Sequence, residues 1–97
     1  AISSKECKRK KKEISLEIEN LFFNEDYNIE PYKIKHRADE TRKSIVDGIN
    51  FIFNDGSAIT VACYDWSNSM ENDNYADSIS VNVSSKEFFY WVRNIAY

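Results

Sequence analysis

A thiol, an imidazole and a carboxylate are the side chains of this sequence with the clearest potential for chemistry. Cys63 and Asp65 are two residues apart, and His36 is the single histidine of the chain. Converged in a cleft, they would supply a nucleophile, a base and an orienting carboxylate. However, Cys63 shares the spacing of the apolar residues Ile59 and Val61, which favours a small buried thiol. We therefore expect no catalytic residues and no enzymatic activity.

Metal and cofactor sites have little support in the spacing of these residues. Cys7, His36 and Cys63 are far apart and show none of the short Cys or His spacings of zinc sites. The sequence contains no glycine-rich phosphate loop, nucleophile elbow or dinucleotide fingerprint. We expect neither a metal ion nor a cofactor.

Carboxylates and aromatic rings are interleaved between residues 65 and 77, a segment rich in Asn, Ser and Asp without Gly or Pro. A loop of this length inside a compact domain is usually functional or mobile. Aromatic anchors within a charged rim are typical of protein interfaces, and an ordinary solvated loop explains the pattern equally well. The candidate partner-binding residues are Asp65, Trp66, Met70, Glu71, Asp73, Tyr75 and Asp77.

The length and composition indicate a single domain over residues 1–97. Of these residues 42% are apolar, enough for one core, and no apolar run approaches the ~20 residues of a membrane span. No secretory signal follows the basic segment near the N-terminus. With only two cysteines, we expect reduced thiols and a cytoplasmic protein without membrane contact.

The net charge of −3 is unevenly distributed. Residues 1–12 carry a net charge of +5, so the other 85 residues carry −8. The basic segment could bind nucleic acid, but it has no interleaved aromatic residues for base stacking. A solvated helix start is better supported, frayed because basic groups at a helix N-terminus oppose the helix dipole. A small nucleic-acid-binding or regulatory module that uses this helix is the alternative function.

The pattern of apolar residues predicts a four-stranded antiparallel sheet. Residues 54–57, Asn-Asp-Gly-Ser, separate two runs of alternating apolar residues, which is a strong hairpin signal. The strand before this turn is expected at 45–53, with a bulge at Gly48. A further alternating run ends near Val83. In a first strand at 32–37, we expect Tyr32, Ile34 and His36 to point inward or lie at the rim.

One helix is predicted at each end of the sheet. The first runs from Ser3 to about residue 24, with Ser3 or Ser4 as its N-cap and Ile14, Ile18 and Leu21 on its apolar face. Phe23 is expected to fold back beneath the following loop, and the alternative is an exposed contact patch. A capping box at residues 84–87 begins the closing helix, which extends to residue 97. Since both helices need an apolar partner, the predicted fold is α+β (α-β-β-β-β-α), with both helices packed on one face of the sheet.

The segment FIFNDGSAITVACYDWS…YADSISVNVSSKEFFYWV, within residues 48–97, resembles small immunity proteins of bacterial toxin systems, especially of contact-dependent growth inhibition. Those proteins are often acidic αβ proteins of this size, with a hairpin, a CYDW-like strand end and a final aromatic helix. The lysine-rich N-terminus departs from that pattern.

This resemblance implies a cytoplasmic, non-catalytic inhibitor that binds and neutralises a cognate toxin, commonly a nuclease such as a tRNase or DNase. A nuclease presents a basic cleft to phosphate, which an acidic surface with aromatic anchors could occupy. We therefore predict a 1:1 complex that forms more slowly as salt rises. The sequence does not predict an oligomeric state.

Overall fold

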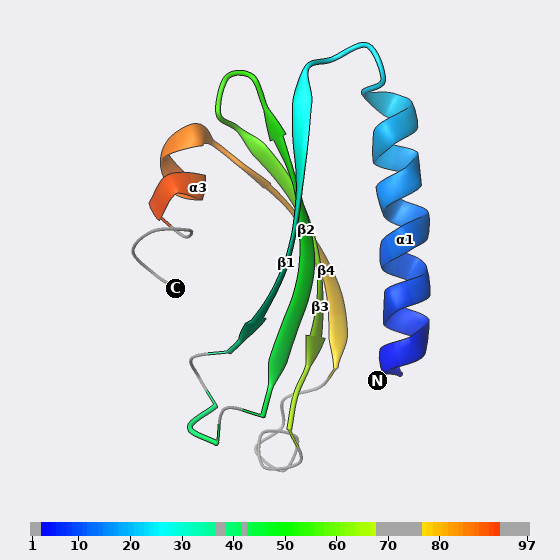
Figure 1. Ribbon diagram of the computed structural model, residues 1–97, viewed down its shortest axis with the longest axis vertical. Coiled ribbons are helices and arrows are strands. Elements are labelled where there is room, and N and C mark those ends of the chain that lie inside the picture. Colours follow the sequence, from blue (N-terminus) through cyan, green and yellow to red (C-terminus); the bar gives the residue numbers. More distant parts are fainter. Residues whose placement is uncertain (1–2, 37–38, 42, 68–76, 92–97) are drawn as a thin grey trace.

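The computed structural model describes residues 3–36, 39–41, 43–67 and 77–91 (Figure 1). They form one long helix, a four-stranded antiparallel sheet in the order β1-β2-β3-β4, and a short helical segment. The elements are α1 (Ser4–Leu21), β1 (Tyr27–Lys35), β2 (Ile45–Phe53), β3 (Ala58–Asp65), β4 (Ser78–Ser84) and α3 (Lys86–Trp91). The predicted α+β class and its four-stranded antiparallel sheet are confirmed. None of the helices in the described ranges is long and apolar enough to cross a membrane.

The hairpin between β2 and β3 forms at the predicted turn. Gly56 has a φ of +88°, which glycine adopts without steric cost. The Asp55 carboxylate accepts a hydrogen bond from the Ser57 backbone N–H at 2.8 Å. The Phe53 N–H in turn donates to the Ser57 carbonyl, also at 2.8 Å. This local chemistry sets a register that places the apolar residues of both strands on the same face.

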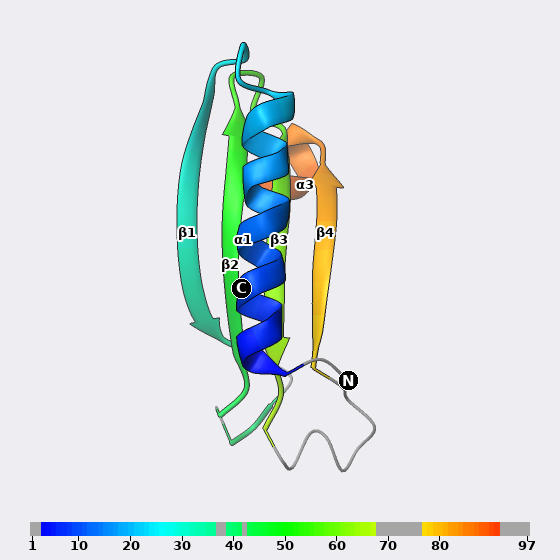
Figure 2. The ribbon, with the colours of Figure 1, turned by 90° about the vertical axis from the view of Figure 1, so that its right-hand side faces the viewer.

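The core lies between α1 and one face of the sheet, which we call the α1 face (Figure 2). Ile18 of α1 is buried together with Phe51 of β2 and with Ile59 and Val61 of β3. These strand residues face α1 because side chains alternate between the two faces of a sheet. Partly buried residues packed against them are Ile14, Phe22, Tyr27, Ile49, Phe53 and Ile79.

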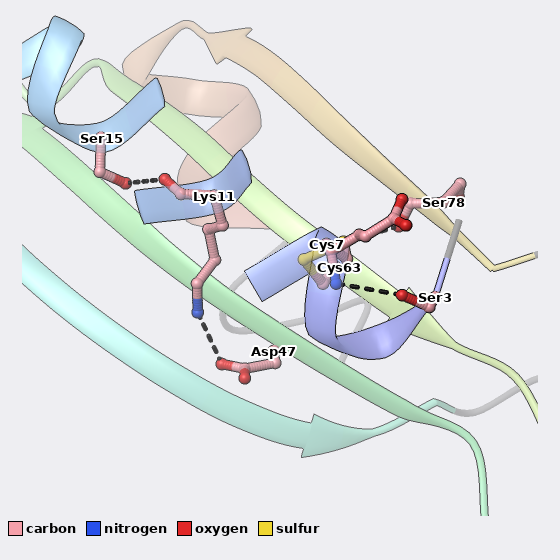
Figure 3. The surroundings of a disulfide bond; sticks show 8 residues. Ser3, Cys7, Lys11, Ser15, Asp47, Cys63 and Ser78 are labelled. Carbon is pink, nitrogen blue, oxygen red and sulfur yellow. Dashed lines mark hydrogen bonds and ion pairs between the residues drawn. A yellow bond between two sulfur atoms is a disulfide. The ribbon is translucent and has the colours of Figure 1, made fainter. Parts of the chain in front are cut away.

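Two contacts attach the basic half of α1 to the sheet (Figure 3). Cys7 and Cys63 form a disulfide whose Cα atoms are 5.9 Å apart. One turn further along α1, the Lys11 ammonium group donates to the Asp47 carboxylate at 2.9 Å. The prediction of two reduced thiols is therefore wrong for this structure. It failed because the cysteines are separated by 56 residues, and only the packing of α1 on β3 brings them together.

The end of α1 differs from the prediction. The helix ends at Leu21 instead of near residue 24, and Leu21 and Phe23 are 76% and 75% exposed. The expectations that Leu21 packs on the sheet and that Phe23 folds beneath the loop are thus wrong. Phe22 covers this end of the core instead, with its ring centroid 5.1 Å from that of Phe53.

The first strand begins five residues earlier than predicted, at Tyr27. Its register pairs Tyr32 with Gly48, and residues of β1 at even positions lie on the face opposite α1. Tyr32, Ile34 and His36 therefore do not point toward the α1 core. The pairing of β2 continues through Gly48 on both sides without a bulge, which corrects the prediction of a kink there.

The described part of the second helix lies on the face of the sheet opposite α1 (Figures 1 and 2). The prediction that both helices pack side by side on one face is therefore wrong for Lys86–Trp91. A single residue, Ser85, connects β4 to α3, and α3 lies on the side of the sheet away from α1. The rest of the predicted closing helix, residues 92–97, lies outside the described residues.

Candidate functional site

Three aromatic rings gather where β1 and β3 end, on the face opposite α1. The centroid of the His36 ring lies 4.7 Å from that of Trp66 and 6.0 Å from that of Tyr64. The rings of Tyr64 and Trp66 are stacked, with centroids 5.9 Å apart and an interplanar angle of 16°. All three residues are half-buried. We call His36, Tyr64 and Trp66 the ring cluster.

Strand pairing brings these distant residues together. Tyr64 pairs with Val46 on β2, and Val46 pairs with Ile34 on β1, so these three share the face opposite α1. His36 lies two residues beyond Ile34, and its backbone N–H donates to the Ser44 carbonyl at 2.9 Å. This bond extends the β1–β2 ladder just far enough to place the imidazole beside the ring of Tyr64.

A buried carboxylate organises the loop beneath the ring cluster. Asp39 is 1% exposed and Ser44 is fully buried. One oxygen of Asp39 accepts from the Thr41 N–H at 2.9 Å, and the other accepts from the Ser44 N–H at 3.0 Å and from its hydroxyl. The Ser44 oxygen then accepts from the Ser67 N–H at 2.8 Å. This chain of hydrogen bonds ties the loop after β1 to the residue that follows Trp66.

The charge states of this region follow from the same contacts. The Ser44 hydroxyl, with further hydrogen bonds from Ser67 and Thr41, holds the pKa of Asp39 well below its usual range, against the opposite effect of burial. Burial lowers the pKa of His36, and the negative charge of Asp39 partly opposes this shift. At neutral pH the site therefore contains a carboxylate beside a neutral imidazole.

A second carboxylate holds the backbone at Trp66. The Trp66 N–H donates to the Asp77 carboxylate at 2.8 Å, although the two residues are eleven apart in the sequence. The bond joins the end of the described range 43–67 to the start of the described range 77–91. Asp77 is half-buried, and this contact occupies one of its oxygens with a structural role. Trp66 is thus positioned by its backbone as well as by its stacked ring.

The structure separates two of the predicted partner-binding residues. Asp65 is exposed, and it lies two positions after Cys63, whose side chain faces α1. Alternation along β3 therefore directs Asp65 to the α1 face, whereas Tyr64 and Trp66 lie on the other face. Asp77 and Trp66 are in contact, but Asp65 does not share their surface. The four remaining predicted residues, Met70, Glu71, Asp73 and Tyr75, lie outside the described residues.

The thiol, imidazole and carboxylate that could have formed a catalytic group are not brought together. Cys63 is 6% exposed and is bonded to Cys7 beneath α1. His36 lies on the opposite face of the sheet, as part of the ring cluster. Across the described residues, no three His, Cys, Asp or Glu side chains are grouped closely enough to hold a metal ion.

The basic segment of α1 is helical from its start. The hydroxyl of Ser3, one of the two N-cap residues predicted, caps the helix by accepting from the Glu6 N–H at 3.2 Å. Lys11 is engaged with Asp47, and Arg9 forms an exposed ion pair with Glu13 at 3.3 Å. The exposed basic residues of this segment are Lys5, Lys8, Arg9, Lys10 and Lys12.

Sequence reasoning named Trp66 and Asp77 as candidate partner-binding residues, but not His36, Tyr64 or Asp39, which the structure places beside them. The spacing of Asp39 and Thr41 is compatible with an Asx turn, in which an aspartate accepts from the backbone two residues on, and was a usable local signal. Nothing local indicated that His36 would meet Tyr64, because their contact depends on two strand registers.

Comparisons with protein-family models, with curated proteins and with solved structures found no match for this chain.

Proposed function

We propose that this chain is a non-catalytic protein-binding domain, and specifically an immunity protein that neutralises a cognate toxin. The observation that carries the proposal is the ring cluster: three half-buried rings at one end of the sheet, held by strands and by the Asp39 network. The resemblance of residues 48–97 to immunity proteins supports the toxin as the class of partner.

Aromatic residues of this kind are effective anchors in protein interfaces. Trp and Tyr dominate binding hot spots because each buries a large area with few rotatable bonds. In this site Trp66 is already fixed by its stacking on Tyr64 and by the bond from its N–H to Asp77. Binding then requires little further ordering, which lowers the entropic cost of association.

Net charge supports a basic partner, such as the surface of a nuclease. Residues 13–97 carry a net charge of −8, and long-range attraction depends on this sum more than on the place of each carboxylate. Since Asp65 and Trp66 lie on opposite faces, we assign the carboxylates of the described residues to steering and the rings to the contact itself. A tRNase or DNase presents such a basic surface to its substrate.

The disulfide favours a second candidate for the compartment in which the domain binds its partner. Inhibition of a nuclease in the cytoplasm requires that the domain keep its fold with both thiols reduced, whereas disulfides persist in oxidising compartments. The Cys7–Cys63 bond therefore supports a partner met outside the cytoplasm, with the same mode of binding. Alkylation of the free thiols in intact cells, followed by mass measurement, distinguishes the two locations.

The test is co-expression with candidate nuclease toxin domains, combined with calorimetry of each purified pair. We expect a 1:1 complex and protection of the cells. Trp66→Ala and Tyr64→Ala should each weaken binding by about 30-fold or more, since hot-spot truncations cost about 2 kcal/mol or more.

Phe23→Ala provides the matched control, because Phe23 is an exposed ring at the opposite end of the sheet from the ring cluster. It should leave affinity unchanged. If the ring-cluster variants stay folded and still bind and protect like the unmodified chain, the proposed contact surface is wrong. If no complex forms with or without reductant, the toxin-neutralising function is wrong.

A further inference from the structure

The two edges of the sheet differ in how well they are protected against pairing with another strand. An exposed edge carries unpaired N–H and C=O groups, and proteins commonly block it with proline or charged residues. The edge strand β1 contains Pro31 and the charged residues Glu30, Lys33 and Lys35. The other edge strand, β4, has the sequence Ser-Ile-Ser-Val-Asn-Val-Ser, without a charge or a proline.

No element of the described chain lies beyond β4. It is the last strand in the sheet order, and Figure 2 shows it along the right-hand margin with no described helix or strand outside it. On its α1 face, Val81 and Val83 are 49% and 81% exposed. A regular, uncharged edge with two exposed valines is a surface suited to strand addition.

We propose that β4 pairs with β4 of a second copy of this chain, antiparallel about a twofold axis at Val81. Val81 is the central residue of β4, so full overlap of the two strands pairs Val81 with its counterpart and Ile79 with Val83. This register keeps the apolar side chains of both strands on one face. The result is a continuous eight-stranded sheet with both copies of α1 on the same side.

The residue sequence of β4 favours a second copy of this chain over an unrelated strand as the partner. A twofold interface requires that each surface be complementary to itself. The sequence of β4 meets this requirement, because small polar and apolar residues alternate symmetrically about Val81, from Ser78 to Ser84. Every apolar residue of one strand then lies opposite an apolar residue of the other.

The charges of α1 supply an independent argument for the same pairing. At 100° per residue, Lys10, Glu13 and Glu17 lie on the flank of α1 that turns toward β4, away from the contact of Lys11 with Asp47. All three side chains of this flank are exposed. The remaining charged residue on this side, Glu6, lies near the helix end.

The twofold axis places opposite charges face to face. Cys7 is bonded to Cys63, which pairs with Ile79, so Cys7 is level with the start of β4. Val81 is about 7 Å further along the strand, which corresponds to four or five residues of α1. The axis therefore passes α1 near residues 11 and 12. Lys10 of each copy then faces Glu13 of the other close to the axis, and Glu17 lies further out, level with Glu6 of the other copy.

The distance between the two helices suits these long side chains. Because α1 lies over β3, three strand spacings separate the two helix axes, about 14 Å in total. That gap is wider than the 8–10 Å of close helix packing. Extended lysine and glutamate side chains span it, so the helices interact by charge while the valines of β4 form the contact below.

Sedimentation velocity of the oxidised full chain over a wide concentration range tests the proposal. We expect reversible dimers for the unmodified chain. Val81→Lys places two ammonium groups beside the axis and should weaken the dimer at least tenfold. Ile29→Lys is the matched control, because Ile29 lies on the other edge strand, on the same face, with a similar exposure of 43%. It should leave the dimer unchanged.

A charge exchange on α1 tests the geometry without altering β4. Lys10→Glu and Glu13→Lys should each weaken the dimer, by about 2-fold to 30-fold for two symmetric exposed pairs. The double variant restores opposite charges and should recover the affinity. If circular dichroism shows that Val81→Lys is unfolded, this series of variants still tests whether the dimer has the proposed geometry.

Three results would overturn the proposal. The first is an unmodified chain that remains monomeric at millimolar concentration, which would leave the β4 edge to a foreign strand or to no partner. The second is a dimer that Ile29→Lys breaks and Val81→Lys does not. The third is a double charge variant that is as weak as, or weaker than, either single variant. Toxin binding is not expected to respond to these variants, since the ring cluster lies on the other face.

Discussion

The ring of Tyr32 lies directly over Gly48 on the neighbouring strand. The two residues are paired across β1 and β2, and a Cβ atom built at Gly48 would overlap the ring, lying 2.6 Å from Cε1. Any larger residue here would have to displace the end of the Tyr32 side chain, and the φ of Gly48 is not in the left-handed region. The close approach fills the centre of the face opposite α1 with an aromatic side chain.

Gly48→Ala should destabilise the protein by about 1–3 kcal/mol, because the added methyl group must displace the Tyr32 ring. Urea denaturation of the variant measures the loss. The double variant with Tyr32→Ala removes the overlap, so Gly48→Ala should cost much less in that background than in the unmodified chain. Equal costs in the two backgrounds would show that the ring is not the cause.

Asp39→Asn should lower the midpoint of thermal unfolding. It should also make that midpoint less dependent on pH in the acid range. The pKa of Asp39 is depressed in the folded chain, so the folded state binds this proton less readily than the unfolded state, where the pKa is about 4. Its contribution to stability is then complete above about pH 4 and is lost as the pH falls below that value.

Thermal melts between pH 7 and pH 2 measure this effect for Asp39. The variant should lose less stability than the unmodified chain on acidification, since asparagine does not titrate. Glu40→Gln, at an exposed neighbouring position, serves as the control and should melt like the unmodified chain at each pH. A pH profile of Asp39→Asn that parallels the unmodified chain would contradict the assignment.

Reduction of the Cys7–Cys63 bond should cost about 4 kcal/mol of stability, the loop-closure value for a separation of 56 residues. Guanidinium denaturation with and without reductant measures it. The Cys7→Ala/Cys63→Ala variant should have the same stability as the reduced chain, and reductant should not change it. Identical midpoints for the oxidised and reduced chain would show that α1 is held by its core contacts alone.

Protonation of His36 should be visible in the fluorescence of Trp66, whose ring centroid is 4.7 Å away. In a Trp91→Phe background, emission should fall as the imidazole becomes charged, with a midpoint below the ordinary value of 6.5 because burial lowers this pKa. Since the folded pKa is depressed, the contribution of His36 to stability is present above pH 6.5 and decreases as the pH falls.

His36→Gln provides the control for that titration. It removes the titrating group but retains a polar side chain of similar size, so the fluorescence transition should disappear. A transition that persists in the glutamine variant would have to come from another group. A midpoint above 6.5 would mean that the charge of Asp39 outweighs burial in setting the pKa.

The strands around the Asn54–Ser57 turn were predictable from the sequence because their signals are local. Alternation of apolar residues fixes which side chains share a face, and Gly56 fixes where the chain reverses. The N-cap at Ser3 was predictable for the same reason, since its partner is three residues away. The predicted bounds of β2 are those of the structure.

Only the tertiary structure decided the features that depend on distant segments. The register of β1 placed Tyr32 and His36 on the face opposite α1, and the packing of α1 brought Cys7 to Cys63. The face of the sheet on which α3 lies, and the contact between His36 and Trp66, also depend on the tertiary structure. Each is a contact between residues ten or more positions apart or the path of a chain end, and no short-range pattern encodes either.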